Sequence, residues 1–155
     1  MLYTEVLGRP VVSTSTALAV GSVSSLVIDP AVQRAVALSL ARTPGGATLL
    51  PWPAIAAFGA DAITVPDDDV LVLDDRLAAL DAKEHAILNK RVLTTEGYEI
   101  GTVGDVEFDP RDGRIVSLLL KSYRWDGGLL VGVGSYAVIV RPQQIRPPEQ
   151  LTGGG

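Results

Sequence analysis

The chain contains one stretch of sequence twice, and this duplication constrains its fold more than any other feature. Residues 20–40 align without a gap on residues 100–120. Similar residues fall at equivalent positions, namely Gly21 and Gly101, Val23 and Val103, Leu26 and Val106, Ile28 and Phe108, Asp29-Pro30 and Asp109-Pro110, and Arg34 and Arg114. The flanks match as well, since residues 7–12 resemble residues 88–93 and residues 59–65 resemble residues 134–140. An internal duplication of this kind predicts two similar structural units.

Each copy has the pattern of a strand, a tight turn and a second strand. In the second copy the turn lies at residues 109–113, where Pro110 suits a φ of about −65° and Gly113 suits a positive φ. On both sides of the turn, apolar residues alternate with other residues, which predicts one apolar face per strand. The apolar positions are Val106 and Phe108 before the turn, and Val116, Leu118 and Leu120 after it. We therefore predict a β-hairpin with one buried face.

At these residues the chain resembles the PRC-barrel domain, a small β-barrel named after the photosynthetic reaction-centre H subunit and also found in a ribosome-maturation factor. The resemblance rests on the order Gly-x-Val-x-x-[Leu/Val]-x-[Ile/Phe]-Asp-Pro, an Arg-led apolar strand, Leu-Pro-Trp-x-x-Ile at residues 50–55, and Gly-x-x-Ala-[Ile/Val]-x-Val. It covers nearly the whole chain as two copies, and implies an all-β fold of two tandem small β-barrels. The copies depart from one another and from the family pattern at three places. Gln33 stands where the second copy has Gly113, Asn89 stands where the family often has Gly, and the second copy lacks the Pro-Trp-Pro of residues 51–53.

The expected organisation is a first repeat at 1–66, an acidic connector with a short helix at 67–87, a second repeat at 88–147 and a disordered tail at 148–155. In the connector, residues 70–73 suit a short strand, and Asp74 or Asp75 suits the N-cap of a helix. Apolar residues of that helix recur at three- and four-residue steps as far as Leu88. We expect this helix to dock between the repeats. The pattern leaves open whether the repeats form separate barrels or exchange strands.

Composition and charge narrow the class of protein. The chain has no Cys, which excludes a disulfide framework and thiolate zinc sites. It shows no secretion signal, and its longest apolar stretch, 127–140, is shorter than the roughly 20 residues of a membrane-spanning helix. We therefore expect a soluble, cytoplasmic protein without a membrane span. Residues 67–84 carry seven acids and two bases, a balance equal to the net charge of −5 of the whole chain. Both repeats are thus close to neutral, which disfavours direct binding of nucleic acid.

Three features suggest chemistry and have simpler explanations. His85 is the single histidine, and no Ser or Asp spacing points to a catalytic triad around it, so a surface helix residue is expected. Asp67-Asp68-Asp69 would supply oxygen ligands for calcium or magnesium, but the alternating ligands of an EF-hand loop are absent and a solvated acidic turn is favoured. The glycines of residues 127–134 are followed by no Lys, unlike those of a phosphate loop. We predict no catalytic residue, no cofactor and no metal site.

Two sets of residues suggest contact with a protein partner. The face of the first hairpin that is expected to point away from the core carries few charges and has Val27 and Ala37 at its centre. An uncharged strand face of this kind needs a cover. The sister repeat, the connector helix and a second subunit are the possible covers, and a homodimer would use the last. Tyr123, Arg124 and Trp125 form an aromatic loop of the kind enriched at interfaces, although packing at the barrel end explains the aromatics equally well. Trp52, between its prolines, is instead expected to plug the core.

The function expected from these features is a non-enzymatic interaction or assembly module, which docks to an unidentified protein partner or self-associates. The family resemblance implies this, because PRC barrels generally serve as docking modules. Two alternatives stay open: a ribosome-associated or RNA-processing factor acting through a protein partner, and a metal-responsive regulator or enzyme that uses Asp67, Asp68 and Asp69.

Overall fold

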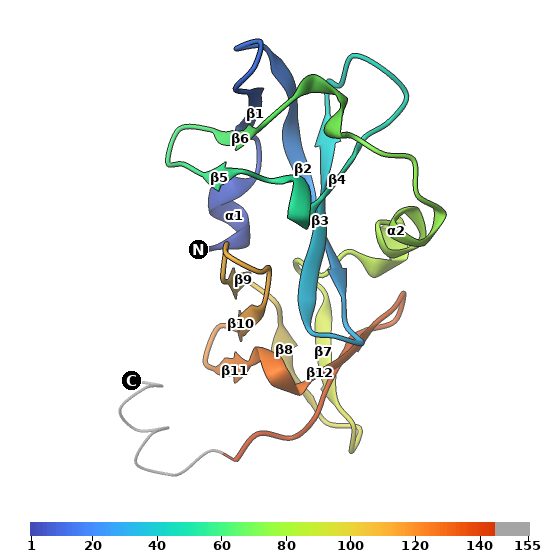
Figure 1. Cartoon of the computed structure of the whole chain (residues 1–155). Helices are drawn as coiled ribbons and strands as arrows, with labels where there is room; N and C mark the ends of the chain where they lie inside the picture. Colours follow the sequence, from blue (N-terminus) through green and yellow to red (C-terminus); the bar gives the residue numbers. More distant parts are fainter. Residues whose placement is uncertain (145–155) are drawn as a thin grey trace.

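The computed structural model describes residues 1–144 and shows two β-rich repeats stacked end to end (Figure 1). The first repeat comprises α1 (Tyr3–Val6), β1 (Pro10–Ser13), β2 (Ala19–Asp29), β3 (Arg34–Ala41), β4 (Leu49–Pro51), η1 (Trp52–Ala54), β5 (Ala57–Phe58) and β6 (Ile63–Val65). The connector comprises η2 (Asp68–Val70), α2 (Asp75–Leu80) and η3 (Lys83–His85). The second repeat comprises β7 (Arg91–Thr94), β8 (Glu99–Thr102), β9 (Asp105–Phe108), β10 (Ile115–Leu119), β11 (Arg124–Asp126), η4 (Gly127–Leu129), β12 (Leu130–Val133) and β13 (Val138–Val140). The expected tail at 148–155 lies outside the described residues.

The strand order of the two repeats follows one plan. The first repeat forms a six-stranded sheet in the order β4-β3-β2-β1-β6-β5. The second repeat splits the same plan into the sheets β11-β10-β9 and β12-β13-β7-β8, because the strand equivalent to β2 is interrupted between β8 and β9. Each repeat also pairs its first and last strands in parallel, with Val11 opposite Ile63 and Val92 opposite Val138. The all-β class and the duplication are confirmed, although the strands of residues 1–144 close neither repeat into a barrel by hydrogen bonds.

One hydrophobic core runs through both repeats. Fully buried side chains of the first repeat, such as Leu38 and Ile63, belong to the same cluster as Phe108, Leu118 and Leu130 of the second. Small domains bury a small fraction of their surface, so a repeat of this size gains stability by sharing a core with its neighbour. The two repeats therefore form one structural unit.

The expected apolar face of β10 needs one correction. Ile115 is 1% exposed, whereas Val116 is half-buried. The pairing of β10 with β9 shifts register between Ile115 and Ser117, as at a β-bulge, where one extra residue reverses which side chains face the core. The same shift between Val27 and Ile28 turns Ala35 inward in the first repeat. The predicted alternation of buried and exposed side chains was therefore wrong by one residue after the turn, where Ile115 and Ala35 face the core.

The connector is ordered as expected at its start and differs further on. The Asp74 carboxylate caps α2 by accepting a hydrogen bond from the Leu77 backbone N–H at 3.0 Å, which confirms the predicted cap. The helix ends at Leu80 and does not continue to Leu88, because Ala82 adopts an extended conformation with ψ of 150°. This break lets Leu77 pack on the first repeat while Ile87 enters the shared core. The strand expected at 70–73 is reduced to a single bridge between Val72 and Leu49.

The cap provides a test of the connector. We expect Asp74→Ala to lower the free energy of unfolding by about 1 kcal/mol, because the helix N-terminus loses its side-chain acceptor. Urea titration followed by circular dichroism measures the change. Asp75→Ala removes a neighbouring exposed carboxylate and keeps the cap, so it serves as the matched control. Equal losses from the two variants would contradict a capping role for Asp74.

Candidate docking site at the junction of the repeats

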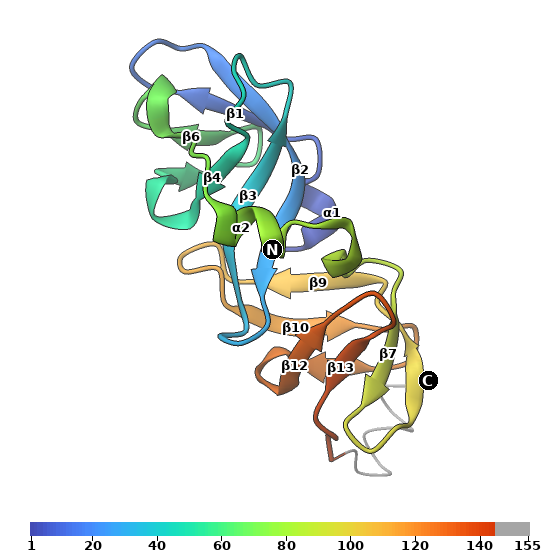
Figure 2. The same ribbon diagram turned by 90° about the vertical axis from the view of Figure 1, so that its right-hand side faces the viewer.

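The charge-free face of the first hairpin is covered by the connector helix. Val27 and Ala37 are both 0% exposed and form a small cluster with Leu49 and with Leu77 of α2. Figure 2 shows α2 lying across β2 and β3. Of the three possible covers, the structure thus uses the connector of the same chain. Val27 and Ala37 are therefore corrected from surface to core residues, and they offer no surface to a partner while α2 is in place.

The predicted aromatic loop is divided between core and surface. Trp125 is 3% exposed, and its indole N–H donates to the Arg141 carbonyl at 3.0 Å. Tyr123 is half-buried and packs edge to face on Trp125, with ring centroids 6.1 Å apart. Arg124 is exposed and donates hydrogen bonds to Glu107 and Ser117. The structure thus brings these three residues together mainly as packing at one end of the second repeat.

The other candidate residues take structural positions. The Asp68 carboxylate accepts a hydrogen bond from the Thr16 hydroxyl at 2.6 Å, and this bond lowers the pKa of Asp68. Within residues 1–144, no group of three or more His, Cys, Asp or Glu side chains is arranged to hold a metal ion. His85 lies half-buried in η3, where Nδ1 donates to the Val133 carbonyl at 2.7 Å. No helix of the described part of the chain is long and apolar enough to cross a membrane.

The repeats are joined by a backbone pair with approximate two-fold symmetry. Arg34 and Arg114, which are equivalent in the duplication, lie opposite each other in an antiparallel bridge. The Ala35 N–H donates to the Gly113 carbonyl at 2.8 Å, and the Ile115 N–H donates to the Gln33 carbonyl at 2.9 Å. Figure 2 shows the tips of the β2–β3 and β9–β10 hairpins crossing near each other at this point.

Around this pair, the tip of each hairpin contacts the other repeat near its 3-10 turn. At the first contact, Trp52 of η1 meets the tip of the β9–β10 hairpin, which carries Gly113. Gly113 lies so close to the first repeat that a Cβ would be 2.1 Å from the Ala35 carbonyl oxygen and 3.3 Å from Trp52. The Trp52 indole N–H donates to the Pro110 carbonyl at 3.1 Å. At the second contact, the tip of the β2–β3 hairpin carries Gln33, and the 3-10 turn η4 begins with Gly127.

Within the second repeat, Gly127 lies against β10, since a Cβ on it would be 2.0 Å from the Ile115 carbonyl oxygen. The Gln33 side-chain amide donates to the carbonyls of Pro30 at 3.2 Å and Leu130 at 3.0 Å. Gln33 holds a φ of 51°, a left-handed conformation that is unfavourable for a residue with a Cβ. The two bonds of its amide compensate for that cost.

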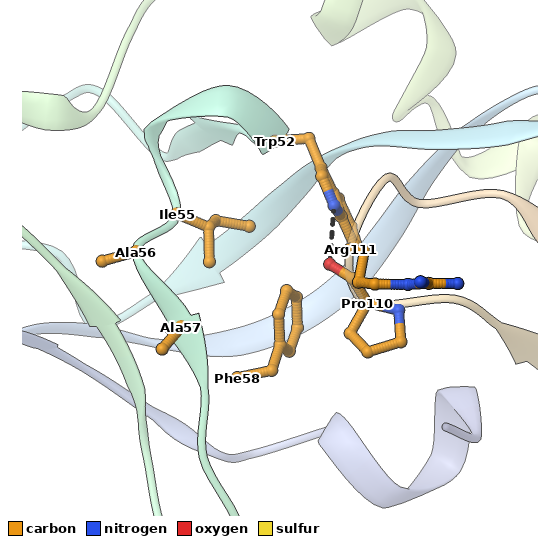
Figure 3. Close-up of a pocket in the computed structure, with 7 residues that line it drawn as sticks. All are labelled: Trp52, Ile55, Ala56, Ala57, Phe58, Pro110 and Arg111. Atoms are coloured by element: carbon orange, nitrogen blue, oxygen red, sulfur yellow. Dashed lines mark hydrogen bonds between the residues drawn. The ribbon is translucent and has the colours of Figure 1, made fainter.

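A narrow slot lies between the first repeat and the tip of the second hairpin (Figure 3). It encloses about 260 Å³ and is lined by Trp52, Ile55, Ala56, Ala57, Phe58, Pro110 and Arg111. Ile55 and Phe58 point across it toward Trp52 and Pro110. Aromatic packing holds one wall in place, since the Trp52 ring centroid is 5.1 Å from that of Phe58 and 5.7 Å from that of Phe108. The slot is therefore a hollow with packed walls, lined by apolar side chains and by polar atoms of the backbone and of Arg111.

Arg111 is the one charged residue of the slot. Its side chain is 87% exposed, and its Nε and Nη2 atoms donate to the Asp109 carboxylate, the latter at 2.7 Å. The Arg111 hydrogen bonds hold the pKa of Asp109 well below its usual range. The guanidinium group has five N–H donors, so the Nη1 side stays available to a ligand.

A wider groove of about 610 Å³ continues from the slot toward α2. It shares Trp52, Ile55 and Arg111 with the slot and adds Arg34 and Arg76 among its lining residues. Arg76 is paired with the buried carboxylate of Asp29 at 2.8 Å. The groove thus joins apolar and cationic surface at the junction.

The family comparison agrees with this duplicated geometry. The model of the PRC-barrel domain matches residues 1–73 and 84–145. The chain belongs to the PRC-barrel domain family. The segment between the two matches, 74–83, contains α2, so the helix that covers Val27 and Ala37 is outside the PRC-barrel pattern. No curated protein matches the chain.

Sequence reasoning missed Ile55, Phe58 and Arg111 as lining residues, although a signal was present. The two PRC-barrel copies differ at Gln33 and Gly113, and again at Trp52, whose equivalent in strand order is Gly127. Unequal residues at equivalent turns indicate that the copies contact each other differently there. The structure brings Gly113 and Trp52 together, but the sequence pattern does not specify how the repeats pack, so this contact was not predictable.

The close approach at Gly113 gives a test of the PRC-barrel junction. Gly97→Ala serves as the control, because Gly97 has a φ of 87° and open space around it. We expect this substitution to lower the free energy of unfolding by about 1–2 kcal/mol through backbone strain alone. Gly113→Ala has a similar φ of 80° and adds the clash with Ala35, so we expect a total of about 3 kcal/mol or more. Thermal and chemical denaturation of both variants measure the difference. Equal losses would show that the junction is looser than described.

The Asp109 carboxylate gives a pH test. We expect Arg111→Gln to raise the pKa of Asp109 toward about 3.9, and Arg114→Gln to raise it less, because the Arg111 hydrogen bonds are the larger cause. A depressed folded-state pKa contributes stability above about pH 3.9 that is lost as the pH falls below it, so the wild type should lose more stability on acidification than Arg111→Gln. Carboxyl carbon shifts in NMR titrations report both pKa values. A pKa of Asp109 insensitive to Arg111→Gln would refute the pairing.

Proposed function

We propose that the chain is a non-enzymatic protein-interaction module that docks a protein partner at the junction of its repeats. Membership of the PRC-barrel family indicates an interaction module in general terms. The observation that carries the specific proposal is the slot beside Trp52 and Arg111, which both repeats build together.

The rigidity of the junction supports docking. Backbone hydrogen bonds of Ala35 and Ile115 fix the hairpins relative to each other, and aromatic packing fixes the wall of the slot. A partner meeting such a surface orders little of it on binding, and association then costs less conformational entropy.

The size and chemistry of the site also favour a protein partner. Pockets for small molecules usually measure about 300–1,000 Å³ and are mostly apolar. The slot is smaller than this, and the adjoining groove has a suitable volume but carries exposed arginines and aspartates. Arg111 is the single titratable side chain of the slot, so the slot contains no pair for general acid and base catalysis. Cytoplasmic location and self-association stay predictions.

Photo-crosslinking in the native host tests the proposal. A photoreactive amino acid replaces Arg111 in one version of the full chain and Glu96 in another. Glu96 is exposed in the turn between β7 and β8, and this turn lies away from the junction in both views (Figures 1 and 2). We expect a covalent adduct with a partner from position 111 and none from position 96, and mass spectrometry identifies it. A ribosomal protein in the adduct would support the ribosome-associated alternative, and a second copy of the chain would show self-association.

Adducts from position 96 alone, or from neither position, would contradict docking at the junction.

A further inference from the structure

The two equivalent contacts at the junction differ in one respect: one is filled by the chain itself and the other is open. At the filled contact, the Gln33 amide of the first repeat donates to the Leu130 carbonyl of the second, and so bridges the tip of the first hairpin to the start of β12. The residue equivalent to Leu130 is Ile55, and the residue equivalent to Gln33 is Gly113, which has no side chain. Within residues 1–144, no group donates a hydrogen bond to the Ile55 carbonyl. The slot occupies the space beside it.

The slot also borders the end of a sheet. β5 is the last strand of the six-stranded sheet and has β6 as its only neighbour among the described strands. Ala56, Ala57 and Phe58 of this segment line the slot. Exposed sheet edges of this kind accept extended peptides through main-chain hydrogen bonds, while pockets beside the edge take side chains.

Arginines without partners give this open side its charge preference. Arg34 and Arg114 lie directly opposite each other, both exposed, and neither side chain forms an ion pair or hydrogen bond with residues 1–144. Like charges opposite each other across strands are destabilising. A carboxylate placed between them would remove that repulsion. Three arginines and two aspartates line the groove, and two of these arginines are already paired, Arg76 with Asp29 and Arg111 with Asp109. The attraction for a carboxylate therefore comes mainly from Arg34 and from Arg114 opposite it.

We propose that the open slot and groove bind an extended, acidic peptide segment of a protein partner. An apolar side chain of the segment enters the slot between Ile55, Phe58 and Pro110, and a backbone N–H of the segment donates to the Ile55 carbonyl. A carboxylate of the segment lies between Arg34 and Arg114, and Arg111 binds a second one. This inference rests on the proposed function and names the kind of partner.

A peptide fits these features better than a nucleic acid. Binding of single strands relies on aromatic rings free to stack on bases, and Trp52 is only 8% exposed. The acidic side chains Asp74 and Asp112 flank the groove arginines and would repel a continuous phosphate backbone. Separate carboxylates on a peptide can avoid them.

Selection from a random library of short peptides displayed on phage tests the proposal with the full chain. We expect the enriched peptides to combine Asp or Glu with an apolar residue. A synthetic copy of one enriched peptide then serves as the probe for calorimetry and NMR. Its affinity should fall about tenfold in Arg34→Gln, Arg114→Gln and Arg111→Gln, and should fall with added salt.

Two controls separate binding from folding. Arg91→Gln removes an exposed arginine that packs on Tyr136, outside the groove, and should leave the affinity unchanged. Arg34→Gln should leave the free chain at least as stable as the wild type, because it relieves the like-charge pair, whereas Arg114→Gln relieves the same pair but also removes the attraction of Arg114 for Asp109. In NMR spectra, the Trp52 indole N–H should shift on binding and the Trp125 indole N–H should not.

Several results would overturn the inference. These are failure to enrich any peptide, enrichment of peptides without acidic residues, an unchanged affinity in the three arginine variants, and displacement of the peptide by a uridine oligonucleotide. A crosslinked partner at position 111 without peptide binding would leave the docking function standing and refute the extended acidic segment. If neither a crosslinked partner nor peptide binding is found, both the docking function and the extended acidic segment are refuted.

Discussion

The backbone pair between Arg34 and Arg114 is the interaction on which the rest of the structure depends. Its two hydrogen bonds, from Ala35 to Gly113 and from Ile115 to Gln33, are equivalent to each other in the duplication, so they align the hairpins about an approximate two-fold axis. This alignment brings Phe108 of the second repeat against Trp52 and Phe58 of the first. The shared core, the slot and the arginine pair all follow from it.

The departures between the copies are complementary parts of this junction. Trp52 meets Gly113 on one side, and Gln33 bonds to the Leu130 carbonyl on the other. At the first contact Trp52 supplies the side chain and Gly113 the space for it, as close packing requires, whereas at the second contact the Gln33 amide supplies a hydrogen bond. The asymmetry therefore does not weaken one repeat. Two different contacts stabilise the junction, and only the contact beside Trp52 is open to a ligand.

Much of the fold was predictable because it depends on local periodicity. Alternation along the strands, the Asp-Pro turns and the duplication led to the all-β class, and Asp74 was recognised as a helix cap from its place before an apolar repeat. The inward turn of Ile115 was not predictable, since a β-bulge depends on pairing with another strand. The end of α2 at Leu80 likewise reflects where Leu77 and Ile87 must pack, one on each repeat.

The candidate site was less accessible from sequence than the fold. Its lining comes from residues 52–58 and 110–111, which are distant in the chain and lie together only after the repeats dock. The charge-free face around Val27 was read correctly as a surface that needs a cover. Which of the three possible covers it receives depends on the position of α2, which local patterns do not determine.

The sharing of the core has a consequence for the order in which the protein folds during its synthesis. Phe108 is buried against Trp52 and Phe58, which leave the ribosome much earlier in translation. Until the β9–β10 hairpin emerges, the nascent amino-terminal half exposes these aromatic rings together with the unpaired backbone of Gln33 and Ala35. The last folding step of the first repeat therefore waits for translation of the second.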